Sequence, residues 1–181
     1  MPDSDSQLVV AHFSTGELPL AFVFSVPGAR EKLVNAPVAG ATGENLSFAL
    51  EHLHRVRPDI FMSSERYSYR IANAYSRPMA NSLGDKSSQA TDSQILSPPN
   101  VTRFLQEVED CRIIILCGKK AQLLFYVIDS TEKKVVCTWH TSNRALAGKY
   151  NFPEVRLESD SLMRRKLRAK FWAQDLLRLL Q

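Results

Sequence analysis

Residues 18–26 read LPLAFVFSV, and Pro27 and Gly28 follow them directly. This run is short and almost continuously apolar, and the Pro-Gly pair predicts that a tight turn ends it. Such a run is typical of a strand buried on both faces, which is the usual condition of strands in a parallel sheet. Residues 112–117, RIIILC, form a second run of this kind, which Gly118 ends. Together the two runs predict the centre of a mainly parallel sheet.

The segments around these runs alternate between the patterns of strands and helices. In residues 43–56 apolar residues recur at helical spacing, and residues 119–128 are also expected to be helical, although their β-branched and aromatic residues leave a strand open. This alternation predicts one domain over residues 1–181, a three-layer α/β/α sandwich with a short, mainly parallel central sheet. The other expected elements are strands at residues 67–72 and 135–140, helices at residues 92–96, 101–109 and 159–180, and a long polar surface loop over residues 81–99.

The composition excludes several classes of protein. With 181 residues, 44% of them hydrophobic and 23% charged, the chain is neither disordered nor fibrous and is long enough to bury its own core. No run approaches the roughly 18 consecutive apolar residues of a membrane-spanning helix, so no membrane contact is expected, and residues 1–10 lack the basic start of a secretory signal. Three widely spaced cysteines, Cys111, Cys117 and Cys137, argue against a disulfide scaffold. They favour buried thiols and a cytoplasmic protein.

The positive charge gathers near the C-terminus. The chain carries a formal net charge of +4, and residues 144–181 hold nine Lys and Arg against four Asp and Glu. A basic segment on a near-neutral body suits contact with a polyanion. The alternative is a helix that docks on the body and turns a solvated basic face outward. The basic cluster of the expected helix at residues 159–180 consists of Arg164, Arg165, Lys166, Arg168 and Lys170.

Polar residues follow the ends of the predicted strands. Ligands of parallel sheets bind at the carboxyl ends of the strands, so we expect these ends to line one cleft. The chain has no Walker-type phosphate loop, no GxGxxG and no GxSxG. The cysteines lack metal-ligand spacing, and His52 and His54 face different sides of a helix, so no metal site is expected. The strand ends in question are residues 25–28, 73–75, 117–118 and 140–142.

Four segments in this order resemble the conserved blocks of a known family. They are residues 22–50 (FVFSVPGAREKLVNAPVAGATGENLSFAL), 69–79 (YRIANAYSRPM), 112–124 (RIIILCGKKAQLL) and 137–146 (CTWHTSNRAL). The likeness, over residues 23–146, is to the uracil-DNA glycosylase superfamily, and within it to the iron–sulfur branch of thermophiles. It implies an enzyme that flips a base out of DNA and hydrolyses its N-glycosidic bond, leaving an abasic site. Water is the nucleophile, so no cofactor is expected. No Lys or amine stands at a motif position, so no lyase step is expected.

The resemblance also implies roles for single residues. Asn73 stands where the family reads the base edge, and His140 where the family polarises the base carbonyl; as alternatives, Asn73 caps a turn and His140 is structural. Pro27 and Gly28 would form a turn that brings main-chain N–H groups to DNA or water. The residues expected to contact the DNA backbone are Ser142, Asn143 and Arg144 after the histidine and Arg164, Arg165 and Lys166 of the basic helix.

The chain departs from the family's pattern at four places, one of which is Thr141 in place of the Pro of the final block. Ser25 replaces the Glu of the first block, so another carboxylate is needed; Glu44 is the first choice, Glu31 the second, and Ser25 a weak substitute. Val38 replaces the Phe that stacks on uracil, which removes stacking and leaves room for a larger base. The cluster's N-terminal cysteine pair has no counterpart and Ser76 lies where a third is expected, so no iron–sulfur cluster is expected.

These departures favour a modified pyrimidine over plain uracil as the substrate. The most specific hypothesis is a bulky modified cytosine of the kind found in phage DNA. The enzyme would then act in anti-phage defence. Two alternatives remain open at this point. One is a catalytically silent member of the superfamily that binds nucleic acid. The other is an enzyme that processes small nucleosides. Release of a base from modified DNA distinguishes a glycosylase from the catalytically silent member. Retention of the protein on DNA at low salt distinguishes a glycosylase from the nucleoside-processing enzyme.

Overall fold

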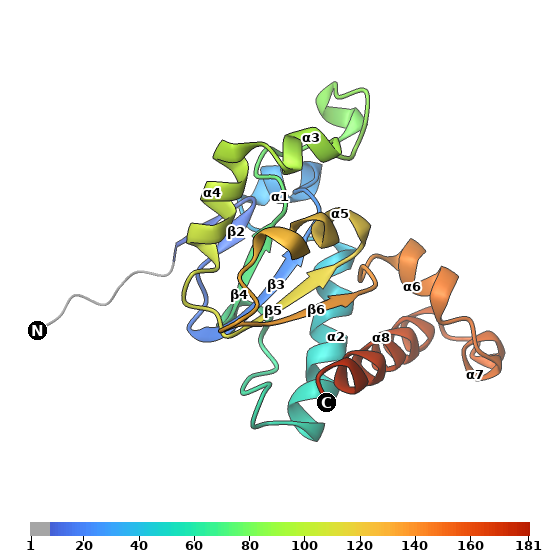
Figure 1. The fold of residues 1–181 in the computed structure, drawn as a ribbon. Helices are drawn as coiled ribbons and strands as arrows, with labels where there is room; N and C mark the ends of the chain where they lie inside the picture. The colour runs from blue at the N-terminus through green and yellow to red at the C-terminus, as the bar shows by residue number, and fades with distance from the viewer. Residues whose placement is uncertain (1–7) are drawn as a thin grey trace, which may run out of the picture.

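The structure, a computed structural model, describes residues 8–181 and contains a six-stranded sheet in the order β1-β2-β4-β3-β5-β6 (Figure 1). The four strands β4, β3, β5 and β6 are parallel, and the hairpin β1-β2 adds antiparallel strands beside β4. The sheet is therefore mainly parallel, as predicted. The strands are β1 (Val9–Val10), β2 (Phe13–Ser14), β3 (Leu18–Phe24), β4 (Tyr69–Asn73), β5 (Ile113–Cys117) and β6 (Lys134–Thr138).

Eight α-helices are described within residues 8–181, and they cover both faces of the sheet (Figure 1). This is the mixed α/β, three-layer arrangement that the alternating pattern predicts. Short 3₁₀ turns lie at Arg66–Ser68, Asn81–Leu83 and Leu123–Val127. The helices are α1 (Ala29–Val34), α2 (Ala41–Val56), α3 (Asp92–Ile95), α4 (Pro98–Glu107), α5 (Lys119–Gln122), α6 (Asn143–Lys149), α7 (Pro153–Leu157) and α8 (Ser161–Leu179).

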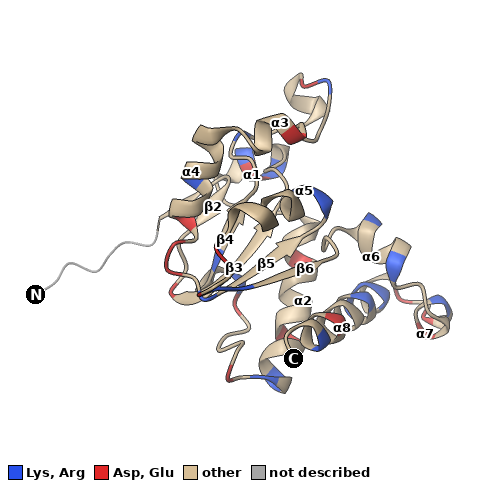
Figure 2. Cartoon of the chain, in the orientation of Figure 1, with Lys and Arg blue, Asp and Glu red and all other residues tan. Residues whose placement is uncertain are grey.

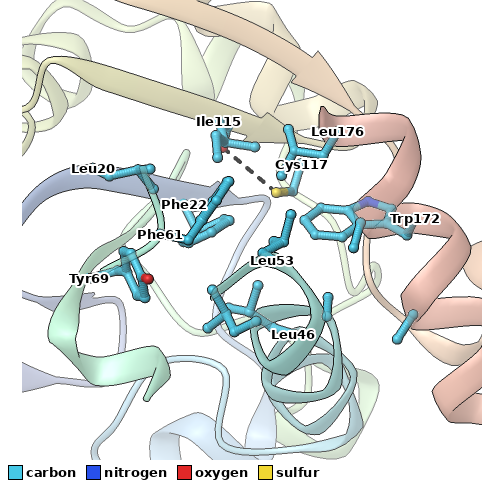
Figure 3. Close-up of a cluster of buried hydrophobic side chains, with 14 of the residues drawn as sticks. Leu20, Phe22, Leu46, Leu53, Phe61, Tyr69, Ile115, Cys117, Trp172 and Leu176 are labelled. Atoms are coloured by element: carbon cyan, nitrogen blue, oxygen red, sulfur yellow. Dashed lines mark hydrogen bonds between the residues drawn. The ribbon is translucent and has the colours of Figure 1, made fainter. Parts of the chain in front are cut away.

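Strand β3 is apolar throughout because both of its faces are buried. Phe22 and Phe24 point into the core under α2 and α8, whereas Ala21 and Val23 point into the core under α3, α4 and α5. Figure 3 shows the first of these two cores, where Trp172 of α8 closes the space between the sheet and α2. The sheet is thus fixed between two helical layers, and its strand ends are held in register.

Several predicted elements differ from the structure. Residues 119–128 are neither one helix nor a strand: α5 ends after one turn and a 3₁₀ turn, Leu123–Val127, follows, which suits the β-branched and aromatic residues there. The hairpin and the short helices α1, α6 and α7 were not predicted, because two-residue strands and single helical turns leave no periodic signal. Helix α8 begins at Ser161, two residues after the expected start, and Asp160 caps it by accepting the Met163 N–H at 2.9 Å.

Two expectations drawn from composition concern the burial of the cysteines and the presence of membrane-spanning helices. Cys111 and Cys117 are buried, but Cys137 is exposed on the edge strand β6, so the prediction of buried thiols is wrong for one of the three. Of the helices in the described part of the chain, none combines the length and the apolar composition that crossing a bilayer needs.

Candidate active site

A cavity of about 490 Å³ opens at the carboxyl ends of the parallel strands, a volume typical of small-molecule sites. Each of the four strand ends expected to share one cleft contributes to its wall. The convergence predicted from the positions of the strand ends is therefore confirmed. The wall includes these candidate residues of the sequence analysis: Ser25, Pro27, Gly28, Glu31, Val38, Asn73, His140 and Ser142.

His140 follows β6 and presents a neutral ring. The main-chain N–H of Ser142 donates to Nδ1 of His140 at 3.0 Å, so the neutral imidazole carries its proton on Nε2. Burial lowers the pKa of His140 to about 4, which keeps the ring neutral at pH 7. The ring of Phe24 packs edge-on against it, with the centroids 5.5 Å apart. The polar group that His140 leaves for a ligand is therefore an uncharged N–H donor.

Buried side chains of two helices fix the main chain on both sides of His140. On one side, Nε1 of Trp172 in α8 donates to the main-chain oxygen of Trp139 at 2.8 Å. On the other side, Nδ2 of Asn45 in α2 donates to the main-chain oxygen of Thr141 at 2.8 Å. Asn45 and Thr141 are each 1% exposed, so water does not compete for the second of these bonds. Asn45 was not predicted from the sequence, because a polar residue in a helix gives no sign of its partner.

Asn73 ends β4 and is 2% exposed. Its Nδ2 donates to the main-chain oxygen of His12, in the β1-β2 turn, at 3.1 Å. Its own main-chain oxygen accepts a hydrogen bond from Nη2 of Arg103 at 3.1 Å. An amide has two N–H donors and one carbonyl oxygen, so one N–H and Oδ1 remain for a ligand. Asn73 and His140 line the same cavity, although they lie 67 positions apart along the chain.

The turn after β3 supplies the carboxylate of the cavity. Gly28 precedes α1, and its N–H donates to Oε2 of Glu31 at 3.0 Å. The N–H that the resemblance assigns to DNA or water is therefore engaged by Glu31. Pro27 accepts the main-chain N–H of Met79 at 2.9 Å, which fixes the turn against the long loop. Ser25, at the end of the strand, is 9% exposed and lies in the same wall.

Val38 has an uncommon backbone conformation. Its φ is 46°, in the left-handed region that β-branched residues rarely adopt, and its side chain is 4% exposed in the cavity wall. Gly43 of α2 lies against it, and a Cβ at Gly43 would be 1.7 Å from the main-chain oxygen of Val38. The close approach of these two main chains holds Val38 in place. Backbone strain of this kind gathers at functional sites.

Glu44 lies outside the cavity wall. Its Oε2 accepts a hydrogen bond from Nη2 of Arg165 at 2.7 Å, and its side chain is 54% exposed. Arg165 also donates through Nε to Oδ1 of Asn45 at 3.1 Å. Arg165 thus docks α8 on α2, which is what the docking alternative for the basic helix expects. Of the two candidate carboxylates, only Glu31 lies in the cavity wall.

The other residues expected to contact a DNA backbone are spread over α6 and α8, and Figure 2 shows Lys and Arg along α8. Oδ1 of Asn143 accepts a hydrogen bond from Nδ2 of Asn45 at 2.8 Å, so this side chain is engaged within the protein. Arg144 is exposed at the start of α6. Arg164 and Lys166 are partly exposed, and Nζ of Lys166 lies 5.2 Å from the ring centroid of Phe48.

The cavity also has wall residues that the sequence analysis did not name. Lys119 and Lys120 directly follow Gly118, so their position after a strand end was a usable signal. Nζ of Lys120 pairs with Asp92 at 2.6 Å. The wall residues in loops could not be predicted in this way, because an irregular loop has no hydrophobic periodicity. The unnamed wall residues are Phe24, Thr42, Met79, Ala80, Ser88, Gln89, Lys119 and Lys120.

Across residues 8–181, no three His, Cys, Asp or Glu side chains lie close enough together to hold a metal ion. The paired histidines illustrate this, since Nδ1 of His54 bonds to the main-chain oxygen of Phe61 at 2.7 Å. Comparison with models of known protein families finds no match, and comparison with curated proteins finds no similar sequence.

Proposed function

We propose that the chain is a monofunctional DNA glycosylase, which flips a base out of DNA and hydrolyses its N-glycosidic bond. One observation supports this most: the amide of Asn73 and the neutral imidazole of His140 line one cavity at the strand ends. An amide with a free oxygen and a free N–H matches a base edge, which presents both donors and acceptors. A neutral N–H donor suits the oxygen of a departing base, because negative charge develops there.

In the proposed reaction the bond between the sugar C1′ and the base nitrogen breaks, and the electron pair leaves with the base. Nε2–H of His140 donates to a carbonyl oxygen of the base and stabilises the developing anion. Since burial lowers the pKa of His140 to about 4, the ring stays neutral and does not have to lose a proton first. Water then adds to C1′ and loses a proton, which the base anion takes up, so that a neutral base and a hydroxyl on C1′ of the sugar are the products.

Glu31 is the carboxylate that suits the sugar side of the reaction. It lies in the cavity wall, and a carboxylate there stabilises positive charge on the sugar and orients water. The bond from Gly28 leaves Oε1 available while holding the group in place. Ser25 lies in the same wall and adds a hydroxyl for the water. Glu44, the first choice from the sequence, is paired with Arg165 instead.

The favoured substrate is a modified pyrimidine. Val38 occupies the wall where the resembling family carries a stacking Phe, so a larger base is accommodated. A bulky phage-type modified cytosine fits this reasoning, and the activity would then serve anti-phage defence. In that case Val38→Phe narrows the cavity and shifts release from the bulky base toward uracil. Equal release of uracil by wild type and Val38→Phe contradicts this version of the proposal.

The test is a panel of DNAs that carry uracil, deaminated purines, oxidised pyrimidines or glucosylated cytosine. Base release is scored by alkaline cleavage at the abasic site, and the wild type is expected to release at least one modified pyrimidine. Binding without release favours the catalytically silent alternative. Release from free nucleosides, with no retention on DNA at low salt, favours the nucleoside-processing alternative.

The two candidate carboxylates provide a matched pair of variants. Glu31→Gln removes a charge from the cavity wall, whereas Glu44→Gln removes one from an exposed ion pair outside it. We expect Glu31→Gln to lower kcat by about 100-fold, on the scale of a positioned catalytic carboxylate. Glu44→Gln is expected to leave kcat unchanged and to alter stability by less than about 1 kcal/mol. The reverse order of effects on kcat would assign catalysis to Glu44.

A further inference from the structure

Four hydrogen bonds around Asn73 form a closed ring. Nδ2 of Asn73 donates to the main-chain oxygen of His12, and Nε2 of His12 lies 3.0 Å from Oε1 of Glu107. Nη1 of Arg103 donates to Oε2 of the same carboxylate. Nη2 of Arg103 donates to the main-chain oxygen of Asn73, which closes the ring. We call these residues the Asn73 ring; they come from the β1-β2 turn, β4 and α4.

The ring is mostly shielded from water. The side chain of Glu107 is 12% exposed, that of Arg103 is 22% exposed and that of His12 is 26% exposed. Burial lowers the pKa of Arg103, while Glu107 opposes that shift. Removing a guanidinium from water is costly unless its donors find partners. Apart from Glu107, its partners here are the main-chain oxygens of Asn73 and Ala74 and Oδ1 of Asn100. The positive charge of Arg103 therefore lies beside the main-chain oxygens at the end of β4.

The ring also determines which way the Asn73 amide faces. Rotating the amide by half a turn would replace Nδ2 with Oδ1 beside the His12 oxygen and set two acceptors against each other. In the observed orientation one N–H is used and Oδ1 is free of partners within residues 8–181. The cavity therefore receives a carbonyl oxygen and one N–H in a defined order. A rotating amide would not distinguish a donor from an acceptor on a ligand.

We propose that His12, Arg103 and Glu107 are positioning residues, which hold the Asn73 amide in a single orientation and so determine the edge of the base that it accepts. The orientation itself is a property of the folded protein. Its effect on base recognition rests on the proposed glycosylase function. None of the three residues is required to touch the substrate, and each acts through Asn73.

The first experiment follows the two Nδ2 protons of Asn73 by ¹H–¹⁵N spectroscopy of the whole chain, with Asn73→Asp to assign them. In wild type one proton is expected to exchange with water about fivefold more slowly than the other, since only one is hydrogen-bonded. Glu107→Gln removes the charge of the ring, and His12→Ala removes the imidazole but keeps the main-chain acceptor. Both are expected to bring the two exchange rates together.

Lys133→Met is the matched control. Lys133 also lies near the end of α4 and donates to main-chain oxygens, those of Val108, Glu109 and Cys111, but it does not contact Asn73. Its loss is expected to lower stability and to leave the protected Asn73 proton unchanged. Equal exchange of both protons in wild type, or their equalisation in Lys133→Met as well, would overturn the proposal. Two ring variants are used so that a failure of one to fold is not decisive.

The second experiment links the ring to base release through a double-mutant cycle. Glu107→Gln is expected to lower kcat/KM by about tenfold in wild type and by less than about twofold in the Asn73→Ala background, because the ring acts through that amide. Equal losses in the two backgrounds would overturn a positioning role. A protected Asn73 proton without any base release by wild type would instead contradict the proposed function and leave the positioning of the amide intact.

Discussion

At the scale of single residues, the site depends on how protons and amide groups are placed. His140 is neutral and oriented because Ser142 donates to one ring nitrogen and burial disfavours the charged form. Asn73 is oriented because His12 accepts one of its protons. Neither arrangement follows from the residue type alone. For His140 the orienting group is a main-chain N–H two residues further along the chain, and for Asn73 it is a main-chain oxygen of a distant segment.

The lowered pKa of His140 predicts a pH dependence of stability. The unfolded chain takes up a proton below pH 6.5, whereas the folded chain does so only near pH 4. Between these values the unfolded state binds more protons, so the free energy of unfolding falls as the pH falls through this window and levels off below it. The contribution of His140 is on the order of 2 kcal/mol, allowing for partial exposure.

Urea unfolding at pH 7 and pH 4.5, compared for wild type and His140→Gln, measures this contribution. The wild type is expected to lose more stability between the two pH values than the variant does. An identical loss in both proteins would show that His140 titrates normally in the folded state.

At the scale of elements, glycines permit the close approaches that form the cavity wall. Gly43 lets α2 begin against the main chain of Val38, and Gly118 lets the turn after β5 pass beside His140. Gly118 has a φ of 90°, and a Cβ there would lie 3.0 Å from Cβ of His140. The end of β5 therefore helps to determine where the imidazole lies.

Gly118→Ala is predicted to displace His140, and Gly84→Ala is its matched control. Gly84 has a φ of 84° but open space around it, so alanine there introduces only backbone strain, which costs about 1–2 kcal/mol. Gly118→Ala carries a similar strain and the contact as well. We expect a larger loss of stability and at least a tenfold loss of base release.

Thermal unfolding and kcat measurements on the two variants compare these effects. Equal behaviour of Gly118→Ala and Gly84→Ala in both measurements would mean that His140 does not depend on the turn after β5.

At the scale of the whole molecule, the distribution of charge bears on the proposed binding of DNA. The four basic residues expected to contact a DNA backbone fall into two groups in the structure. The guanidinium of Arg165 is hydrogen-bonded to Glu44 and Asn45. No carboxylate within residues 8–181 pairs with the second group, which consists of Arg144, Arg164 and Lys166. Only the second group is available to phosphates.

Neutralising Arg144, Arg164 and Lys166 one at a time, to Met or Gln, is predicted to weaken DNA binding and to reduce its salt dependence. Each lost phosphate contact lowers the slope of log K against log salt by about 1. Arg165→Met is predicted to lower stability instead, with little change in slope. Slopes that remain unchanged in all three single variants would place the DNA on another face of the molecule.

Much of the fold was predictable, because the apolar runs of β3 and β5 have only one reasonable interpretation. The candidate site was predictable where its residues directly follow such runs, as Asn73 and His140 do. Glu44 was preferred over Glu31 because it directly follows Gly43 at a predicted helix start, and the sequence does not tell whether that start faces the strand ends. No pattern in the sequence pointed to Asn45, Arg103 or His12. The hydrogen bonds that connect them to the site are made with residues far away in the chain.

The sequence alone determined the four parallel strands, the layers and the order of the polar groups along the chain, because hydrophobic periodicity and turn residues act locally. The tertiary structure decided which of these groups meet. The cavity exists because four strand ends converge. The orientation of Asn73 depends on a hairpin that adds to the sheet edge, and the pKa of His140 depends on burial between layers. Hydrogen bonds and desolvation act between segments distant in sequence, so only the packed molecule specifies them.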